Sequence, residues 1–396
     1  MTPAARVQAA IDILDTVLEN GFHSELALKA WGHDNRYAGS KDRAAIQDHV
    51  YDALRNLRTF AAWGGSMTGR AILISALREA SIEPTTIFTG QRFAPLPLTQ
   101  GENIKRNRLS SKESFNLPNW LCPIWKKDLD YKAEDVALAL TSRAPVFLRV
   151  NSQKTSRAQA INKLRDEGII CDAHRGVPSA LVVKTGQRGI KHSKSYLEGF
   201  VELQDASSQL SVCRLHKTIS GPFLDYCAGA GGKTLALANH FRECIYAHDG
   251  IPKRLRPLEA RARRAGAKVM LLNGNSLKCG HYGLVFADVP CSGSGTWRRD
   301  PTGKWRLQPD ELKDLITLQY SILTKAKRFL RSGGLLVYAT CSVLRRENTD
   351  QIKKFLTEYP QWRVLHENQI YPSDNGDGFY FCYLQKPYIS LNLDTG

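Results

Sequence analysis

Two cysteines in this chain each follow a short apolar run that is typical of a buried β-strand. Cys291 lies in the segment DVPCSGSG, after residues 284–287, and Cys341 lies in YATCS, after residues 335–338. A single cysteine is most often a small buried hydrophobe. A pair at the carboxyl ends of adjacent strands would instead face one crevice, where the ligands of such sheets bind. Because a thiolate is a strong nucleophile, the pair indicates a reactive site.

An earlier segment, LDYCAGAGGKT (residues 224–234), predicts a ligand-binding turn between a strand and a helix. Its glycines allow a sharp turn, and the first helical turn offers free N–H groups. A phosphate loop would need a glycine five positions before Gly232, where Cys227 stands, so that interpretation is set aside. Asp249 follows the next predicted strand, where a carboxylate would accept hydrogen bonds from ribose hydroxyls. At this point NAD and S-adenosylmethionine both fit.

The elements around these segments alternate between strands and helices after Gly221. Apolar runs predict strands at residues 223–226, 244–248, 268–272, 284–287 and 335–338. Helical periodicity lies between them, at residues 233–240, 253–265 and 309–331. This alternation predicts an α/β domain with a parallel, doubly wound sheet.

The part of the chain before residue 216 has a different pattern. Apolar residues at helical spacing predict helices within 4–30, 44–63 and 67–79, and the polar, basic stretch 101–118 indicates a linker or exposed loop. From Pro145, strand-like runs at 146–150 and 180–183 enclose a helix that Ser156 caps and Gly168 ends. We therefore expect a helical domain with its linker (1–125), a small α+β module (126–215) and the α/β domain (216–396).

Composition limits the partners and the compartment. Lys and Arg number 55 against 38 Asp and Glu, and the net charge of +17 favours nucleic acid first and an acidic membrane surface second. The nine cysteines form no CxxC pair, so neither a zinc site nor a secreted disulfide scaffold is expected. No apolar run approaches the roughly 18 residues of a membrane span. We expect a cytoplasmic, soluble monomer with no metal and no membrane partner.

Two basic clusters favour RNA as the polyanion. The first comprises Lys253, Arg254, Arg256, Arg261, Arg263 and Arg264. The second comprises Arg298, Arg299, Lys304 and Arg306, with Trp297 and Trp305 among them. Cations interleaved with aromatic rings suit contacts to phosphates and stacking on unpaired bases. The alternative for each cluster is a solvated surface without a partner.

Together with the glycine turn, the two cysteine segments resemble the RsmB/NOP2/Sun family of RNA cytosine-5 methyltransferases, closest to its bacterial RsmB branch. The motifs that carry this resemblance are DYCAGAGGKT, DVPCSGSG and YATCS, with looser landmarks at residues 145–151, 198–210 and 377–386. The N-terminal helices are similar to the NusB-like RNA-binding domain of that branch, and the small module to an RRM-like fold. The resemblance implies a Rossmann-like domain that transfers a methyl group from S-adenosylmethionine to C5 of a cytosine in RNA, giving 5-methylcytosine.

By this resemblance each site residue has an expected role. Cys341 is the nucleophile that adds to C6 of cytosine, and Cys291 assists release of the product. Asp288 hydrogen-bonds the base, and Lys233 helps to lower a thiol pKa. The residues expected to bind the cofactor are Cys227, Ala228, Gly229, Ala230, Gly231, Gly232, Lys233, Asp249, Asn275 and Asp288. The chain departs from the family pattern at Ala230, Val289 and Asn275, and none of these is a reacting group.

The substrate has alternatives. DNA cytosine methylases carry their nucleophile in a Pro-Cys motif, which Pro290-Cys291 matches, but they do not need a second cysteine after the next strand. Cys341 therefore favours RNA. Small-subunit ribosomal RNA is the expected substrate, with a role in rRNA processing, and transfer RNA is the alternative. From another class, the alternative is a non-catalytic RNA-binding assembly factor on the same fold.

Overall fold

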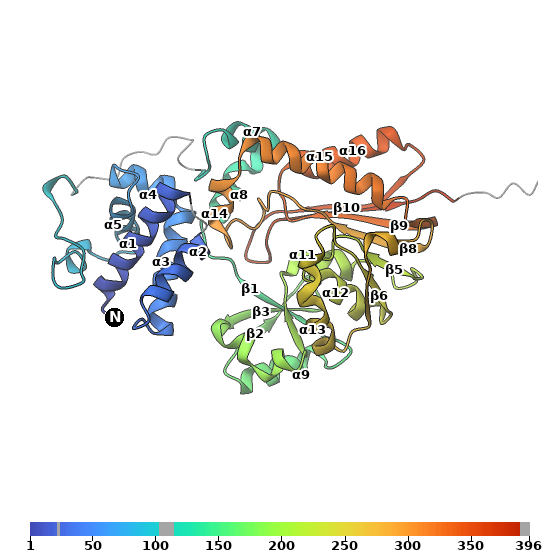
Figure 1. Ribbon diagram of the computed structural model, residues 1–396, viewed down its shortest axis with the longest axis horizontal. Helices are drawn as coiled ribbons and strands as arrows, with labels where there is room; N and C mark the ends of the chain where they lie inside the picture. Colours follow the sequence, from blue (N-terminus) through green and yellow to red (C-terminus); the bar gives the residue numbers. More distant parts are fainter. Residues whose placement is uncertain (22–23, 103–114, 389–396) are drawn as a thin grey trace, which may run out of the picture. The chain divides into compact units, whose positions relative to one another are not determined.

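A computed structural model describes residues 1–21, 24–102 and 115–388 (Figure 1). Most of the linker expected at 101–118 lies outside the described residues. The chain forms two compact units. The first comprises Met1–Arg143 and Trp297–Pro309, and the second comprises Ala144–Thr296 and Asp310–Gly396. In the described part of the chain, no helix is both long and apolar enough to cross a membrane.

The first unit is helical, as predicted. Its main helices are α1 (Pro3–Asn20), α2 (Ser24–Asp34), α3 (Ser40–Arg55), α4 (Leu57–Gly64), α5 (Gly69–Glu79), α7 (Leu121–Leu129), α8 (Ala133–Ala139) and α14 (Pro301–Arg306). Thr2 and Thr68 cap α1 and α5 by accepting hydrogen bonds from backbone N–H groups of the first turn. The apolar stripe of α3, Ile46, Val50 and Leu54, lies in the core of this unit.

The segment Trp297–Pro309 packs into this helical unit. Its burial contradicts part of the prediction that the second basic cluster contacts RNA. Arg298 and Lys304 are each only 1% exposed, and Trp297 is 2% exposed and stacks on Trp125. Arg55 Nε donates to the carbonyl of Arg298 at 2.7 Å, and Lys304 Nζ donates to the carbonyl of Arg55 at 2.9 Å. The prediction that these three side chains meet RNA is therefore wrong, because all three are buried in the core of this unit.

Burial of Lys304 makes stability depend on pH. Desolvation lowers the pKa of Lys304 to about 7, whereas an unfolded lysine titrates near 10.4. Between these values the unfolded chain binds more protons, so the unfolding free energy should rise with pH by at most about 1.4 kcal/mol per pH unit. Lys304→Met should flatten this slope and raise the melting temperature at pH 7, measured by thermal unfolding between pH 7 and 9. The exposed control Lys41→Met should keep the wild-type slope, and an unchanged slope in Lys304→Met would contradict the assignment.

The second unit begins with the small α+β module. Its elements are β1 (Val146–Val150), α9 (Arg157–Asp166), β2 (Ile170–Ala173), β3 (Ala180–Thr185), α10 (Lys194–Leu197) and β4 (Val201–Leu203). The strands form an antiparallel sheet in the order β2-β3-β1-β4. Ser156 caps α9 as predicted, in a capping box with Gln159. The short strands β2 and β4 give too little apolar sequence to be recognised in advance.

The rest of the second unit is a seven-stranded sheet in the order β10-β11-β9-β8-β5-β6-β7. Its strands are β5 (Phe223–Asp225), β6 (Ile245–Ala247), β7 (Val269–Leu271), β8 (Tyr282–Asp288), β9 (Leu330–Thr340), β10 (Arg363–Ile370) and β11 (Phe379–Gln385). The five strands β5 to β9 are parallel, as predicted. The sheet also contains two strands that the sequence did not predict, β10 and β11, and β11 runs antiparallel to both β9 and β10.

Helices cover both faces of this sheet (Figure 1). On one face α15 (Pro309–Ala326) and α16 (Thr349–Glu358) pack on Leu336 and Tyr338 of β9. On the other, α11 (Ala206–Cys213) and α12 (Gly232–Phe241) pack on Val337 and Ala339. This alternation is the period-two pattern of a strand buried on both sides. The chain leaves β5 toward β6 on one side and returns at β8 on the other, which creates a switch point for ligand binding between β5 and β8.

Candidate active site

An ion pair spans the switch point. Asp288 ends β8 and Lys233 lies in the first turn of α12, and their Oδ2 and Nζ atoms are 2.9 Å apart. The Lys233 side chain is 8% exposed, and its ammonium also lies over the ring of Phe379, 4.6 Å from the centroid. Two of the predicted site residues thus meet at the carboxyl edge of the sheet. The ammonium of Lys233 is held by Asp288. That Lys233 helps to lower the pKa of a thiol stays a prediction.

The two cysteines come together next to the end of β8, the strand that carries Asp288. Their sulfur atoms are 3.3 Å apart, close enough to share a proton, and both thiols are free and half-buried. The strands explain the meeting, because β8 and β9 are parallel neighbours with Asp288 opposite Ala339. The hydrogen bond to Cys341, together with burial, raises the pKa of Cys291 well above its usual range. Cys291 therefore holds its proton and can donate it toward Cys341.

The glycine turn needs glycine because of both its backbone conformation and the close packing around it. Gly231 has φ +88°, and a Cβ at this position would lie 2.1 Å from a methyl carbon of Leu258 on α13 (Arg256–Ala265). Gly229 has φ +51°, and its N–H donates to Asp249 Oδ2 at 2.9 Å. Asp249 Oδ1 accepts from the N–H of Ile251 at 2.8 Å. The predicted ribose acceptor thus lies against the glycine turn, and it also fixes that turn.

Asp225, at the end of β5, is a site residue that sequence reasoning missed. Its side chain is fully buried, and Oδ2 accepts a hydrogen bond from the Thr234 hydroxyl at 2.7 Å. Its Oδ1 atom is buried with no hydrogen-bond partner, and burial raises the pKa of Asp225 to about 7. An unsatisfied buried oxygen is costly unless a ligand donates to it. The orphaned atom therefore fits a cofactor with a cationic or N–H donor beside the glycine turn.

Comparison with known proteins shows which family the chain resembles. Residues 214–385 match the family described as 16S rRNA methyltransferase RsmB/F, and residues 117–188 match the ferredoxin-like domain of RsmF/B-like methyltransferases. Ribosomal RNA small subunit methyltransferase B of Citrobacter koseri is 32% identical over 72% of this chain and 70% of its own length. The chain belongs to the RsmB/F methyltransferase family.

Further likenesses agree with this membership. The protein of the same name from Vibrio cholerae is 31% identical over 69% of this chain, which spans 66% of that relative's length, just under two thirds. The solved structure of PH0851 superposes with a TM-score of 0.75, at 23% identity, and covers 98% of this chain and 100% of its own. The structural likeness concerns the fold, which is the Rossmann-like fold expected from the sequence.

The remaining predicted cofactor residues of this family member lie along the same edge of the sheet. Ala228 is buried, and Cys227 is half-buried, with a pKa raised by burial. Asn275 lies on an exposed turn beyond β7, in which Asn273 Oδ1 accepts hydrogen bonds from the backbone N–H and the hydroxyl of Ser276. The assignment of Asn275 to the cofactor stays a prediction.

The first basic cluster divides into structural and exposed members. Arg261 and Arg264 both pair with Glu202 of β4, whose side chain is 3% exposed. Arg261 also donates to the carbonyl of Ala230 in the glycine turn. These two cations hold α13 to the small module, so they are not a free RNA surface. The exposed members are Lys253, Arg254, Arg256 and Arg263.

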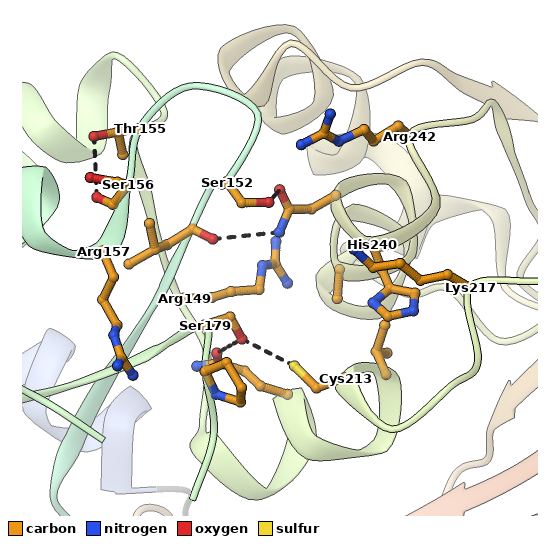
Figure 2. A pocket seen from close by; sticks show the side chains of 16 residues that line it. Arg149, Ser152, Thr155, Ser156, Arg157, Ser179, Cys213, Lys217, His240 and Arg242 are labelled. Carbon is orange, nitrogen blue, oxygen red and sulfur yellow. Dashed lines mark hydrogen bonds between the residues drawn. The ribbon is translucent and has the colours of Figure 1, made fainter. Parts of the chain in front are cut away.

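A cavity of about 470 Å³ lies between the small module and helices α11 and α12 (Figure 2). Its lining contains none of the site residues predicted from the sequence. Ser152 and Thr155 come from the module, and His240 and Arg242 come from the end of α12 opposite to Lys233. Arg149 in its wall donates to the carbonyl of Gly232 at 2.9 Å. The cavity is thus separate from the cysteine pair, and its wall supports the glycine turn.

Proposed function

We propose that the chain is an S-adenosylmethionine-dependent methyltransferase that acts on C5 of a cytosine in RNA. The observation that carries this proposal is the 3.3 Å approach of Cys291 and Cys341 beside Asp288 and Lys233, at the edge of the sheet that holds the glycine turn. Its relatives are named ribosomal RNA small subunit methyltransferase B, which supports small-subunit ribosomal RNA as the substrate. The exposed cations of α13 support a polyanionic partner.

The residues that would hold the cofactor are those of the glycine turn, with Asp249 and Asp225. Asp249 retains carboxylate lone pairs for ribose hydroxyls, and the orphaned Oδ1 of Asp225 offers an acceptor to a positively charged donor. When bound, S-adenosylmethionine supplies an electrophilic methyl group.

The two thiols divide the chemistry at the base. The Cys341 thiolate donates an electron pair to form the bond to C6, and the displaced ring electrons make C5 nucleophilic. N3 takes up a proton from solvent as sulfur adds and returns it as sulfur leaves. Asp288 accepts hydrogen bonds from the exocyclic amine and from the N3–H group, which stabilises the electron-rich ring. After C5 carries the methyl group, loss of the C5 proton to solvent and departure of sulfur restore the ring. The Cys291 thiol hydrogen-bonds the departing Cys341 sulfur and so assists its release.

Position-resolved sequencing of 5-methylcytosine tests the proposed function. RNA from a strain that lacks this chain should lose the modification at one or a few cytosines of small-subunit ribosomal RNA, and the purified chain with S-adenosylmethionine should restore it. Loss confined to transfer RNA would change the substrate class. No lost cytosine methylation, together with RNA binding by the purified chain, would instead support a non-catalytic assembly factor.

Asp249→Ala should weaken S-adenosylmethionine binding by about tenfold, as expected for loss of a charged hydrogen-bond acceptor. The measurement is the dissociation constant by titration calorimetry, with thermal unfolding to check the fold, because Asp249 also anchors Gly229 and Ile251. The matched control is Asp172→Asn on the exposed surface of the small module. An unchanged dissociation constant in Asp249→Ala would reject the ribose-acceptor assignment.

A further inference from the structure

Glu347 is a fully buried carboxylate between the two cysteine loops. It ends the short helix η7 (Arg345–Glu347), and its side chain has no exposed surface. Its Oε1 accepts from Ser292 N at 2.8 Å and from Gln319 Nε2 at 2.9 Å. Its Oε2 accepts from the hydroxyls of Ser292 at 2.6 Å and Ser342 at 2.5 Å. Four donors therefore converge on one carboxylate.

These donors come from the residues next to the two thiols. Ser292 follows Cys291 and Ser342 follows Cys341, so one carboxylate ties both loops to the same point. Gln319 of α15 adds a third link, because the same side-chain nitrogen also donates to the carbonyl of Pro290 at 2.9 Å. The relative position of the two sulfur atoms thus depends on a residue that contacts neither the predicted cofactor turn nor the ion pair of the site.

The charge of Glu347 also reaches the thiols. Its four donors are neutral groups, so they delocalise the negative charge without cancelling it. A nearby negative charge disfavours a thiolate, and Glu347 is one cause of the raised pKa of Cys291, after the Cys341 hydrogen bond and burial. Tyr338 of β9 donates its hydroxyl to the Glu347 carbonyl at 2.6 Å and stays protonated, since burial raises its pKa.

Charged groups on the surrounding elements lie farther along the same segments. Arg345 and Asp350 pair with each other at 3.5 Å and are both close to half exposed. Lys233 and Asp288 pair with each other at the end of β8. Among the described residues, Glu347 is the carboxylate that accepts hydrogen bonds from both cysteine loops.

We propose that Glu347 is a positioning residue that holds Cys291 and Cys341 at their working distance, and that its charge disfavours the thiolate form of Cys291. The consequence for methyl transfer rests on the proposed function, but the effect on the thiols does not. Glu347→Gln preserves shape and one acceptor oxygen while removing the charge. Glu347→Asp preserves the charge while shortening the reach to Ser292 and Ser342.

The test measures thiol ionisation directly. The rate of alkylation of Cys291 by iodoacetamide is followed by mass spectrometry from pH 7 to 11, in the full chain without RNA. In Glu347→Gln the midpoint of the Cys291 profile should fall by about one pH unit, since removing a nearby like charge favours the thiolate. Glu347→Asp should keep the wild-type midpoint. The control Glu358→Gln, on the exposed end of α16, should leave the profile unchanged.

A wild-type midpoint in folded Glu347→Gln would overturn the electrostatic part of the inference. In methyl-transfer assays both Glu347 variants should lower kcat by about tenfold or more, with little change in the S-adenosylmethionine dissociation constant. Wild-type kcat in both variants would overturn the positioning part. If the wild-type chain transfers no methyl group, the proposed function fails while the alkylation profile still decides the role of Glu347.

Discussion

Cys341→Ala should lower methyl transfer to RNA by about 10³-fold or more and should form no covalent complex with RNA. Losing the nucleophile blocks entry to the covalent path, because no sulfur remains at this position to form the bond to C6. The measurement combines methyl incorporation from labelled S-adenosylmethionine with denaturing electrophoresis of the chain mixed with substrate RNA. The matched control is Cys279→Ala, since Cys279 is an exposed free cysteine away from the pair.

Residual transfer within tenfold of the wild type in Cys341→Ala would remove Cys341 as the nucleophile. Thermal unfolding of the variant separates this outcome from misfolding. The substitution replaces a half-buried thiol by a methyl group and should cost little stability.

Cys291→Ala should have the opposite signature, because a protein–RNA adduct should accumulate and survive denaturing electrophoresis. Addition and methylation can still proceed through Cys341, but the thiol that lies 3.3 Å from the departing sulfur is gone. Its raised pKa keeps that thiol protonated, which is the form that can assist a leaving thiolate. Turnover should fall by about 10²-fold or more. The adduct should be absent from the double variant that lacks both cysteines.

The reverse pattern would exchange the two roles. If the adduct forms in Cys341→Ala and vanishes in Cys291→Ala, the chain works like the DNA cytosine methylases. The argument for RNA from the second cysteine would then lose its main support, whereas the basic surface of α13 would still favour a polyanion.

Prediction succeeded where the information is local. The strands β5 to β9 and helices α9, α12 and α13 follow from apolar runs and from caps such as Ser156, which act within a few residues. The meeting of Cys291 and Cys341 also follows, since parallel neighbouring strands carry their carboxyl ends to one edge. The hairpin β10–β11 was not predicted from the sequence. Its pairing partner β9 is distant in sequence, and the polar run of β10 carries no strand signal.

The sequence by itself determined the glycine turn and the order of the elements around it, and it predicted which groups react. Tertiary structure decided which charged residues lie on the surface and which are buried inside the fold. The sequence predicted Arg298 and Lys304 as cations for RNA, yet both are buried, and the backbone carbonyl of Arg55 accepts a hydrogen bond from Lys304. The sequence analysis did not single out Glu347, which the fold encloses with four donors from three segments. Whether a charge can be buried depends on partners that only the folded chain brings within hydrogen-bond distance.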